Sequence, residues 1–486
     1  MIGCTPPAAP AGVDPAPMLF NSGIFLQFFA AFLLLYWLVR NNLTARNLLI
    51  VASSYLFYGW WNWKFLGLLF FSSAFDWAVG YGIARLQTAR GRKALLAGSI
   101  VVNLGILGFF KYYNFFVASL TVLLGKLGVP FHTGTLNVIL PVGISFYTFQ
   151  SMSYAFDVYR GHIRPTRNFL SFLAFVSFFP HMVAGPIQRV SNLLPQFERT
   201  LVITRPMLEE GIWLMIWGMF KKVVIADSLA PLVEMVFHDE PPGAAAVALG
   251  TLAFGLQIYG DFSGYSDIAR GTARVLGFDI MWNFDLPYFA TSLREFWRRW
   301  HISLSTWLRD YLYISLGGNR RGPARACVNV FLTMLLGGLW HGAAWNYVLW
   351  GAWHGAGLVA ERILSTEHET RNTSHPLRRL ASWLATMLIV FYGWLLFRAG
   401  SWHQVAAMTK ALANPSAPPW LGSFAFSLAV FAAPLVAMEL WQFRAKNRLV
   451  PLTLSGWTRA LLQGALLVGI MVFWTREKAA FIYFQF

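Results

Sequence analysis

The chain has 486 residues, of which 57% are hydrophobic and 12% are charged, whereas a soluble protein carries about 25% charged residues. Long apolar stretches recur along the whole length. They exclude a large soluble domain and predict one membrane-embedded domain from residue 18 to residue 486. The net charge is +17, but the lysines and arginines cluster in short loops between apolar runs. That pattern indicates cytoplasmic membrane loops rather than a nucleic-acid-binding surface.

The first 17 residues are rich in proline and alanine and lack the basic segment of a secretory signal peptide. Because Met18 directly precedes the first apolar run, we expect residues 1–17 to be a disordered extension or the product of a misassigned start codon. The cysteines, Cys4 and Cys327, lie in unrelated contexts, so neither a disulfide framework nor a zinc motif is predicted, and no metal site is expected. Cys327 could carry an acyl group, but free cysteine usually packs as a small hydrophobe.

The apolar runs predict membrane helices, and the basic residues between them indicate which loops are cytoplasmic. The first run is followed by Arg40 and Arg46, which places the N-terminus outside. Basic residues at 85–93 and 160–167 mark two further cytoplasmic loops. The runs in this half of the chain are 19–39, 48–61, 65–83, 94–110, a weaker segment up to 127, and 138–159.

The run 169–182 is shorter than the ~20 residues that a crossing needs, and it ends in a proline- and glycine-containing segment. We therefore expect it to be re-entrant, which is tolerated when protein surrounds it. The later runs are 211–225, 244–259, 328–340, 345–359, 381–397, 424–441 and 461–474. The predicted fold class is an all-α polytopic bundle with about eleven crossings by hydropathy, together with re-entrant and interfacial helices.

One histidine, His341, lies inside an apolar, glycine-rich run at 333–345. Ionisable groups at membrane depth are costly, and they usually face a protein interior or a water-filled cavity. Histidine can also accept and release a proton near neutral pH. His341 is therefore a candidate for acid–base chemistry within the bilayer. The alternative is a packing histidine that bonds a neighbouring helix.

The stretch 292–311 is predicted to form one helix with two stripes. The aromatic and apolar stripe consists of Leu293, Trp297, Trp300, Leu304, Trp307 and Tyr311. The polar stripe consists of Arg294, Arg298, His301 and Ser305. Such a helix could simply lie in the membrane interface. The functional interpretation is a cationic wall beside a histidine, suited to a phosphate-bearing acyl donor.

Two further patterns are ambiguous. His354 follows His341 by 13 residues, so the two do not share a face of one straight helix, and we expect His354 to be structural or to line a substrate path.

Asp261 and Asp267 lie near an apolar run and could act as an acid–base pair. The nearby glycines, serines and arginines favour a polar helix break with local ion pairs at least as strongly.

Several runs resemble the membrane-bound O-acyltransferase family: 140–150, 183–187, 261–267, 296–313 and 338–342. The resemblance extends from Met18 to about residue 398 and is most specific between 290 and 355. The tail is only generically similar, and Gly260 stands where an aromatic residue is expected. The family's essential histidine, in its Trp-His-Gly motif, corresponds to His341, and the histidine of its Arg-Trp-His-Ile-Ser motif corresponds to His301.

The resemblance implies a funnel that meets a central tunnel across the bacterial inner membrane. Acetyl-CoA would approach from the cytoplasm as a substrate, with no tightly bound cofactor. His341 would act as the general base, and His301 would orient a reactant or share the proton. Arg294, Arg298 and Arg299 are candidates for the donor phosphates. The acetyl group would reach an exported polysaccharide such as alginate, through a separate periplasmic transferase.

Two interpretations from other classes stay open on the sequence. A transporter would use the same intramembrane polar residues as a substrate path, and acetyl transfer by purified protein would distinguish it. A lipid-binding scaffold of an exopolysaccharide complex would need no reactive histidine. The acceptor is also open, because cellulose or peptidoglycan would be served by the same core.

The basic loops generate a test of topology. Single cysteines placed at 85–93 or at 160–167 in a cysteine-free variant should resist an impermeant thiol reagent in intact cells, because both loops are predicted to be cytoplasmic. Both should react once the membrane is permeabilised. Labelling of either loop in intact cells would reverse the orientation.

Overall fold

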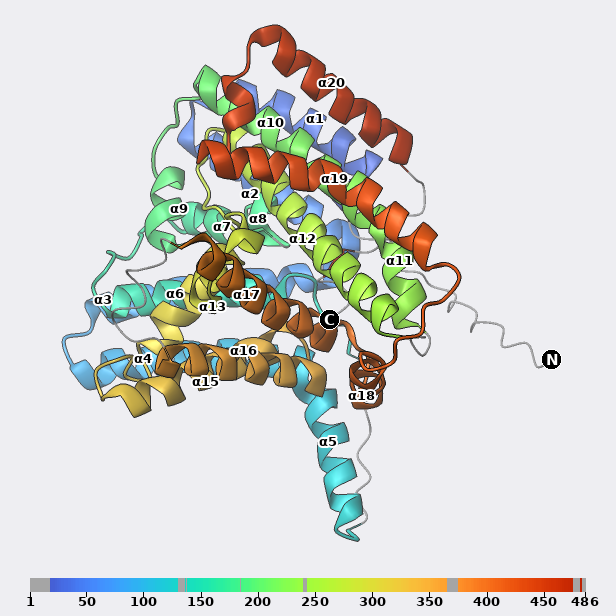
Figure 1. The fold of residues 1–486 in the computed structure, drawn as a ribbon. Helices are drawn as coiled ribbons and strands as arrows, with labels where there is room; N and C mark the ends of the chain where they lie inside the picture. The colour runs from blue at the N-terminus through green and yellow to red at the C-terminus, as the bar shows by residue number, and fades with distance from the viewer. Residues whose placement is uncertain are drawn as a thin grey trace.

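The computed structural model describes residues 18–129, 136, 138–183, 185–238, 243–364, 375–474 and 481–482. Every regular element in these residues is helical, which confirms the all-α class (Figure 1). Most helices lie side by side in one body, from which α5 (Tyr113–Lys126) projects. The predicted extension at residues 1–17 lies outside the described residues.

The N-terminal half begins with four helices. These are α1 (Gly23–Val39), α2 (Leu43–Asn62), α3 (Leu66–Arg85) and α4 (Ala89–Leu107). A π-helical segment, η2 (Gly108–Tyr112), connects α4 to α5. Next come α6 (Ile144–Tyr159), α7 (Phe169–Ser177), α8 (Phe179–Met182) and α9 (Val190–Phe197). Helices α7 and α8 are almost entirely buried, as a re-entrant segment requires.

The C-terminal half contains the longest helices. The elements after α9 begin with α10 (Arg205–Phe220), the π-helical η3 (Lys221–Ala226), α11 (Asp227–Phe237), α12 (Ala244–Val275), α13 (Leu293–Arg299), α14 (Ile302–Trp307) and the π-helical η5 (Leu308–Tyr313). They continue with α15 (Pro323–His341), α16 (Trp345–Leu364), α17 (Pro376–Arg398), α18 (Trp402–Ala411), α19 (Leu421–Ala445) and α20 (Gly456–Phe473). Short 3₁₀ turns are η1 (Trp63–Phe65), η4 (Pro287–Phe289) and η6 (Val450–Thr453).

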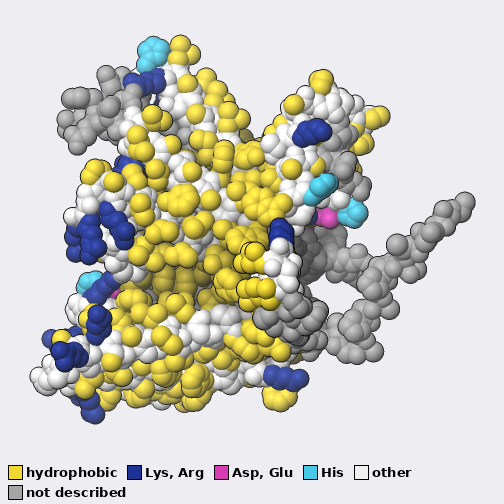
Figure 2. All heavy atoms as spheres, turned by 90° about the horizontal axis from the view of Figure 1, so that it is seen from below, with side chains coloured by type: hydrophobic (Ala, Val, Ile, Leu, Met, Phe, Trp, Pro, Cys, Tyr) yellow, Lys and Arg dark blue, Asp and Glu magenta, His cyan; other side chains and the backbone are white. Residues whose placement is uncertain are grey.

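Seven continuous helical stretches in the described chain are long and apolar enough to cross a membrane, which supports a multi-pass membrane protein. They are Leu43–Arg85, Ala89–Lys126, Ala244–Val275, Pro323–His341, Pro376–Arg398, Leu421–Ala445 and Gly456–Phe473. The first two stretches each contain two helices joined by a short 3₁₀ or π-helical segment. The count of eleven crossings stays a prediction. Figure 2 shows the matching surface, a broad apolar face with one group of lysines and arginines along its left edge and others scattered around it.

The two loops predicted to be cytoplasmic lie at the same end of the bundle. The Arg92 guanidinium donates to the backbone carbonyl of Tyr159, at 3.0 Å. Arg160 in turn donates to the backbone carbonyl of Asp310 at 2.9 Å and to Ser315 Oγ at 3.0 Å. These contacts place the η5 segment at the end of the molecule where the basic loops meet.

The expected polar helix break at 257–267 is wrong, because α12 runs without interruption through this segment. The carboxylates are instead paired with lysines of the neighbouring π-helical segment η3. Lys222 Nζ lies 2.8 Å from carboxylate oxygens of both Asp227 and Asp261, and Lys221 Nζ lies 2.7 Å from Asp267. Because these ion pairs compensate the buried carboxylates, α12 can continue as a regular helix through this segment. The ion pairs engage both carboxylates, which favours the structural interpretation of Asp261 and Asp267 over an acid–base pair.

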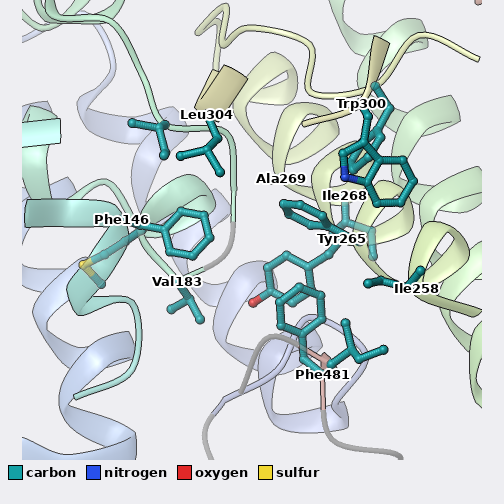
Figure 3. Close-up of a cluster of buried hydrophobic side chains, with 14 of the residues drawn as sticks. Phe146, Val183, Ile258, Tyr265, Ile268, Ala269, Trp300, Leu304 and Phe481 are labelled. Carbon is teal, nitrogen blue, oxygen red and sulfur yellow. The ribbon is translucent and has the colours of Figure 1, made fainter. Parts of the chain in front are cut away.

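The hydrophobic core continues on both sides of α12. Figure 3 shows Tyr265 of α12 among side chains from distant parts of the chain, including Phe146, Trp300 and Phe481. The Tyr265 ring lies 4.4 Å from the Phe20 ring and 4.6 Å from the Phe481 ring, measured between centroids. Residues near both ends of the described chain therefore pack on the same central helix.

Candidate active site

His341 is the last residue of α15, and the chain turns to an extended conformation at Gly342. Its side chain is 5% exposed. The imidazole is enclosed by aromatic rings, with centroid distances of 5.1 Å to Trp350 and 5.5 Å to Phe397. Trp350 belongs to α16 and Phe397 to α17, so the imidazole of His341 lies between three helices.

Glycines next to His341 allow the backbones of α15 and α16 to pack very closely. A Cβ atom on Gly338 would lie 2.2 Å from the Tyr347 carbonyl oxygen, and one on Gly351 would lie 2.5 Å from the Met334 carbonyl oxygen. A Cβ on Gly342 would lie 2.2 Å from the Tyr347 ring. The backbones of α15 and α16 therefore approach closely at these glycines, and small residues serve this purpose in membrane helix packing.

The single helix predicted over 292–311 is wrong, because the chain breaks at His301. Helix α13 ends at Arg299, and α14 begins at Ile302. His301 adopts a left-handed conformation with φ of 43°, which costs an L-residue roughly 1–2 kcal/mol. The backbone N–H of Ile302 donates to the Asn283 carbonyl at 2.8 Å. Helical periodicity could not reveal this tertiary bond, which holds the break.

The break turns His301 into the core, where it is fully buried. Its ring centroid lies 6.3 Å from that of His341, so the structure brings the two predicted histidines together. Had the helix continued, His301 would have stayed on one stripe with Arg294 and Arg298. The Phe262 ring packs edge-on against His301 at 4.6 Å.

Asn283 fixes how His301 is oriented. Its Oδ1 lies 3.1 Å from His301 Nδ1 and accepts from Ser303 Oγ at 2.8 Å, while its Nδ2 donates to Ser266 Oγ at 3.2 Å. An amide oxygen can only accept, so this arrangement places the imidazole proton on Nδ1 and the basic lone pair on Nε2. Asn283 was missed on the sequence because it lies in an irregular loop. A polar residue inside an otherwise aromatic Trp-Asn-Phe run was the only signal.

Two cavities meet at His341. The first, of about 170 Å³, follows α15 past Val330 and Gly337 and is also lined by Arg309 and Tyr313 of η5. The span from Val330 to His341 is about 16 Å at 1.5 Å per residue. We call this the α15 cavity. The second, of about 90 Å³, is lined by Lys111, Gly143, Phe146 and Trp340 as well as His341. We call it the Lys111 cavity.

The three arginines proposed from the sequence lie outside both sets of lining residues. Arg299 is bound to Glu295 at 2.8 Å and to the Asp285 carbonyl at 3.0 Å. Arg294 lies 3.9 Å from Glu361, and Arg298 is exposed. Arg309 of η5 does line the α15 cavity, and its side chain is 61% exposed. It was missed although it follows Ser305 by four residues and so continues the polar stripe. Its guanidinium lies 2.7 Å from the Asp310 carboxylate.

His354 lies on α16 and is fully buried. Its ring packs against Trp350 at 5.0 Å and Trp297 at 5.1 Å, and it lines neither cavity. Cys327 lies near the opposite end of α15 from His341 and is partly exposed. In the part of the chain that the structure describes, no three His, Cys, Asp or Glu side chains gather as metal ligands.

Comparison with known proteins agrees with the geometry. A model of the membrane-bound O-acyltransferase family matches residues 161–399, which include both histidines. The chain is 47% identical to the probable alginate O-acetylase of Azotobacter vinelandii over 399 residues, covering 80% of this chain and 78% of that protein. It is 46% identical to the probable alginate O-acetylase of Pseudomonas aeruginosa, and the match covers 81% of this chain and 75% of that protein. The chain is 33% identical to the peptidoglycan O-acetyltransferase of Helicobacter pylori, and the match covers 81% of this chain and 80% of that protein.

The glycine contacts generate a matched pair of substitutions. Gly351→Ala should destabilise the protein by about 1–3 kcal/mol, as overpacking typically does, because the new methyl would press on the Met334 carbonyl. Gly464→Ala in α20, where a Cβ would meet nothing within 4 Å, should be neutral or slightly stabilising because alanine is the better helix former. Thermal unfolding in detergent measures both. Equal melting temperatures would show that the α15–α16 approach is not tight.

Proposed function

This chain belongs to the membrane-bound O-acyltransferase family, and we propose that it moves an acetyl group from a cytoplasmic donor to an exported polysaccharide, with alginate as the favoured acceptor. The observation that carries the proposal is the position of His341, a buried histidine at the meeting point of two cavities. The high identity to two alginate O-acetylases over most of the chain supports the choice of acceptor.

His341 acts as the general base in this proposal. An acceptor hydroxyl is a weak nucleophile until a neighbouring base removes its proton. The hydroxyl oxygen attacks the carbonyl carbon of the acetyl thioester, and its proton passes to His341. The carbon–sulfur bond then breaks, and the proton leaves with the thiolate. The aromatic enclosure around His341 keeps bulk water from competing for the acetyl group.

His301 is proposed to assist from 6.3 Å away, measured between ring centroids. The Asn283 contact presents the Nε2 lone pair of His301, which can hold a hydroxyl proton in a hydrogen bond. This orienting role agrees with the buried position of the ring. Its loss should therefore impair transfer less than loss of the base itself.

The α15 cavity is proposed as the donor passage. Its η5 end lies where the two basic loops meet, on the side predicted to be cytoplasmic. A narrow cavity that follows α15 suits the extended thiol-bearing arm of acetyl-CoA, whose phosphates would stay outside. Arg309 lines the passage at that end. Arg294, Arg298 and Arg299 stay candidates for the same phosphates, because α13 contributes Trp297 to the cavity wall.

The location that fits this route is a bacterial inner membrane, with the acetyl group delivered to the periplasm and passed on by a separate periplasmic transferase. Peptidoglycan is the second candidate acceptor, favoured by the 33% identity to a peptidoglycan O-acetyltransferase. Deletion of the gene in its native host separates the two candidates. Acetyl ester should disappear from the exopolysaccharide and stay unchanged in peptidoglycan, and the opposite result would reassign the acceptor.

Histidine substitutions test the chemistry. General-base help contributes about 10²- to 10⁴-fold in rate, so His341→Ala should nearly abolish acetyl transfer at matched membrane levels. His341→Gln should also fail, because an amide can hydrogen-bond but cannot take the proton. His301→Ala should be impaired less severely, and His354→Ala should retain most activity. Wild-type transfer by His341→Gln would rule out the general-base role.

Arginine substitutions test the donor passage. Arg309→Ala should raise the KM for acetyl-CoA more than it lowers kcat, which is the signature of lost uniform binding. The triple substitution of Arg294, Arg298 and Arg299 should have the same effect if these residues also hold phosphate. The control is Arg205→Ala, whose side chain is exposed, pairs with Glu209 and lines neither cavity. An unchanged KM with reduced membrane yield would indicate that α13 only anchors the protein at anionic headgroups.

A further inference from the structure

Lys111 is an intramembrane cation that the proposed reaction does not yet use. It lies in the π-helical segment η2, where α4 gives way to α5. Its Nζ donates to the carbonyl oxygen of Trp340 at 2.7 Å and to that of His341 at 3.0 Å. The neighbouring Tyr112 hydroxyl donates to the Leu339 carbonyl at 2.8 Å. Two consecutive residues of η2 therefore bind the last turn of the helix that carries His341.

Two helix-terminal carbonyls offset part of the cost of burying a lysine ammonium here. The last carbonyls of a helix have no intrahelical partners and form the negative end of its dipole. A lysine that binds two of them is stabilised as a cation, and the Trp340 ring lies 5.8 Å from the same nitrogen. The helix terminus thus holds a positive charge next to the reactive histidine, at a depth where an unpaired charge would be costly.

The ammonium has one donor left over. A lysine ammonium has three N–H donors and no acceptor, and the two carbonyls take two of them. Lys111 also lines the Lys111 cavity, whose wall includes His341. The two carbonyl bonds hold the nitrogen in place, so the remaining N–H needs no reorganisation before it can bind a group in that cavity. A π-helical segment is a frequent feature of functional sites because it re-aims a side chain.

We propose that Lys111 is a catalytic residue whose third N–H binds the carbonyl oxygen of the acetyl group and stabilises the oxyanion that forms there. This proposal rests on the acyl transfer proposed above. When the acceptor oxygen bonds to the acetyl carbon, the π electron pair of the acetyl C=O bond moves to the carbonyl oxygen, which lies next to the ammonium. The proton of the acceptor hydroxyl moves to His341. When the C=O bond reforms, the carbon–sulfur bond breaks and the thiolate takes the proton. Lys111 itself neither gains nor loses a proton.

The alternative is that Lys111 only caps α15. Kinetics and stability together separate the two roles. Removing one oxyanion donor typically lowers kcat by about 10²- to 10³-fold with little change in KM, whereas losing a cap lowers the melting temperature and the yield of folded protein. Lys111→Arg keeps the charge and several donors, so it should restore part of kcat under the catalytic role.

The experiment compares Lys111→Met, Lys111→Gln and Lys111→Arg with Lys126→Met, a control at the end of α5 that lines neither cavity. CoA release from acetyl-CoA is measured in membrane vesicles of the native host lacking its own copy of the gene, with thermal unfolding of the same full-length variants. The kcat of Lys111→Met and Lys111→Gln should fall at least tenfold, while their KM stays within about twofold of the wild-type value. Lys111→Arg should recover part of the lost kcat. If Met does not fold, Gln replaces it, because its amide can still donate to the two carbonyls without a charge.

Three results would overturn the proposal: wild-type kcat in Lys111→Gln, a loss confined to KM, or an Arg variant with restored melting temperature but no restored kcat. His341→Ala is measured in the same vesicles. If it is inactive while Lys111→Gln is fully active, only the role of Lys111 fails. If His341→Ala is active, the proposed general base fails, whatever Lys111 does.

Discussion

The close contact between α15 and α16 is the constraint on which the proposed active site depends. His341 ends α15, and the ring of Trp350 that encloses it comes from α16. Both are in place only because Gly338 and Gly351 let the two backbones approach to distances that a Cβ would forbid. In a membrane, apolar burial gives helices little reason to associate, so close packing has to supply that energy. The glycines therefore belong to the site as much as the histidine does.

The same constraint of the bilayer governs the charged residues. Charges at membrane depth must be paired or face a cavity, and the π-helical segments η2 and η3 carry lysines that meet this demand. Lys221 and Lys222 in η3 pair with carboxylates of α12 and α11. Lys111 in η2 binds helix-terminal carbonyls, and Arg309 in η5 reaches the α15 cavity. An added residue in the turn shifts each side chain relative to a regular helix.

His301 and Asn283 show how strain and hydrogen bonding are balanced at the centre. His301 occupies a left-handed conformation that a continuous helix would have avoided. The break brings the His301 ring next to His341. Asn283 accepts from the backbone N–H of Ile302 and lies within hydrogen-bond distance of His301 Nδ1. Unfavourable backbone geometry at functional residues persists when the surrounding structure fixes it. Here the fixing group is one amide from a loop between α12 and α13.

The sequence by itself determined the class of the protein and the identity of the central histidine. Apolar runs and basic loops specify a helical membrane protein because the bilayer imposes span length and charge placement locally. His341 could be identified because an ionisable residue in an apolar run stands out without any tertiary information. The tertiary structure alone decided that 292–311 is broken, that α12 is continuous, and that Asn283, Arg309 and Lys111 lie at the site. Each of these depends on a partner distant in the sequence, such as the Asn283 carbonyl, the η3 lysines or the end of α15, and local periodicity carries no record of such partners.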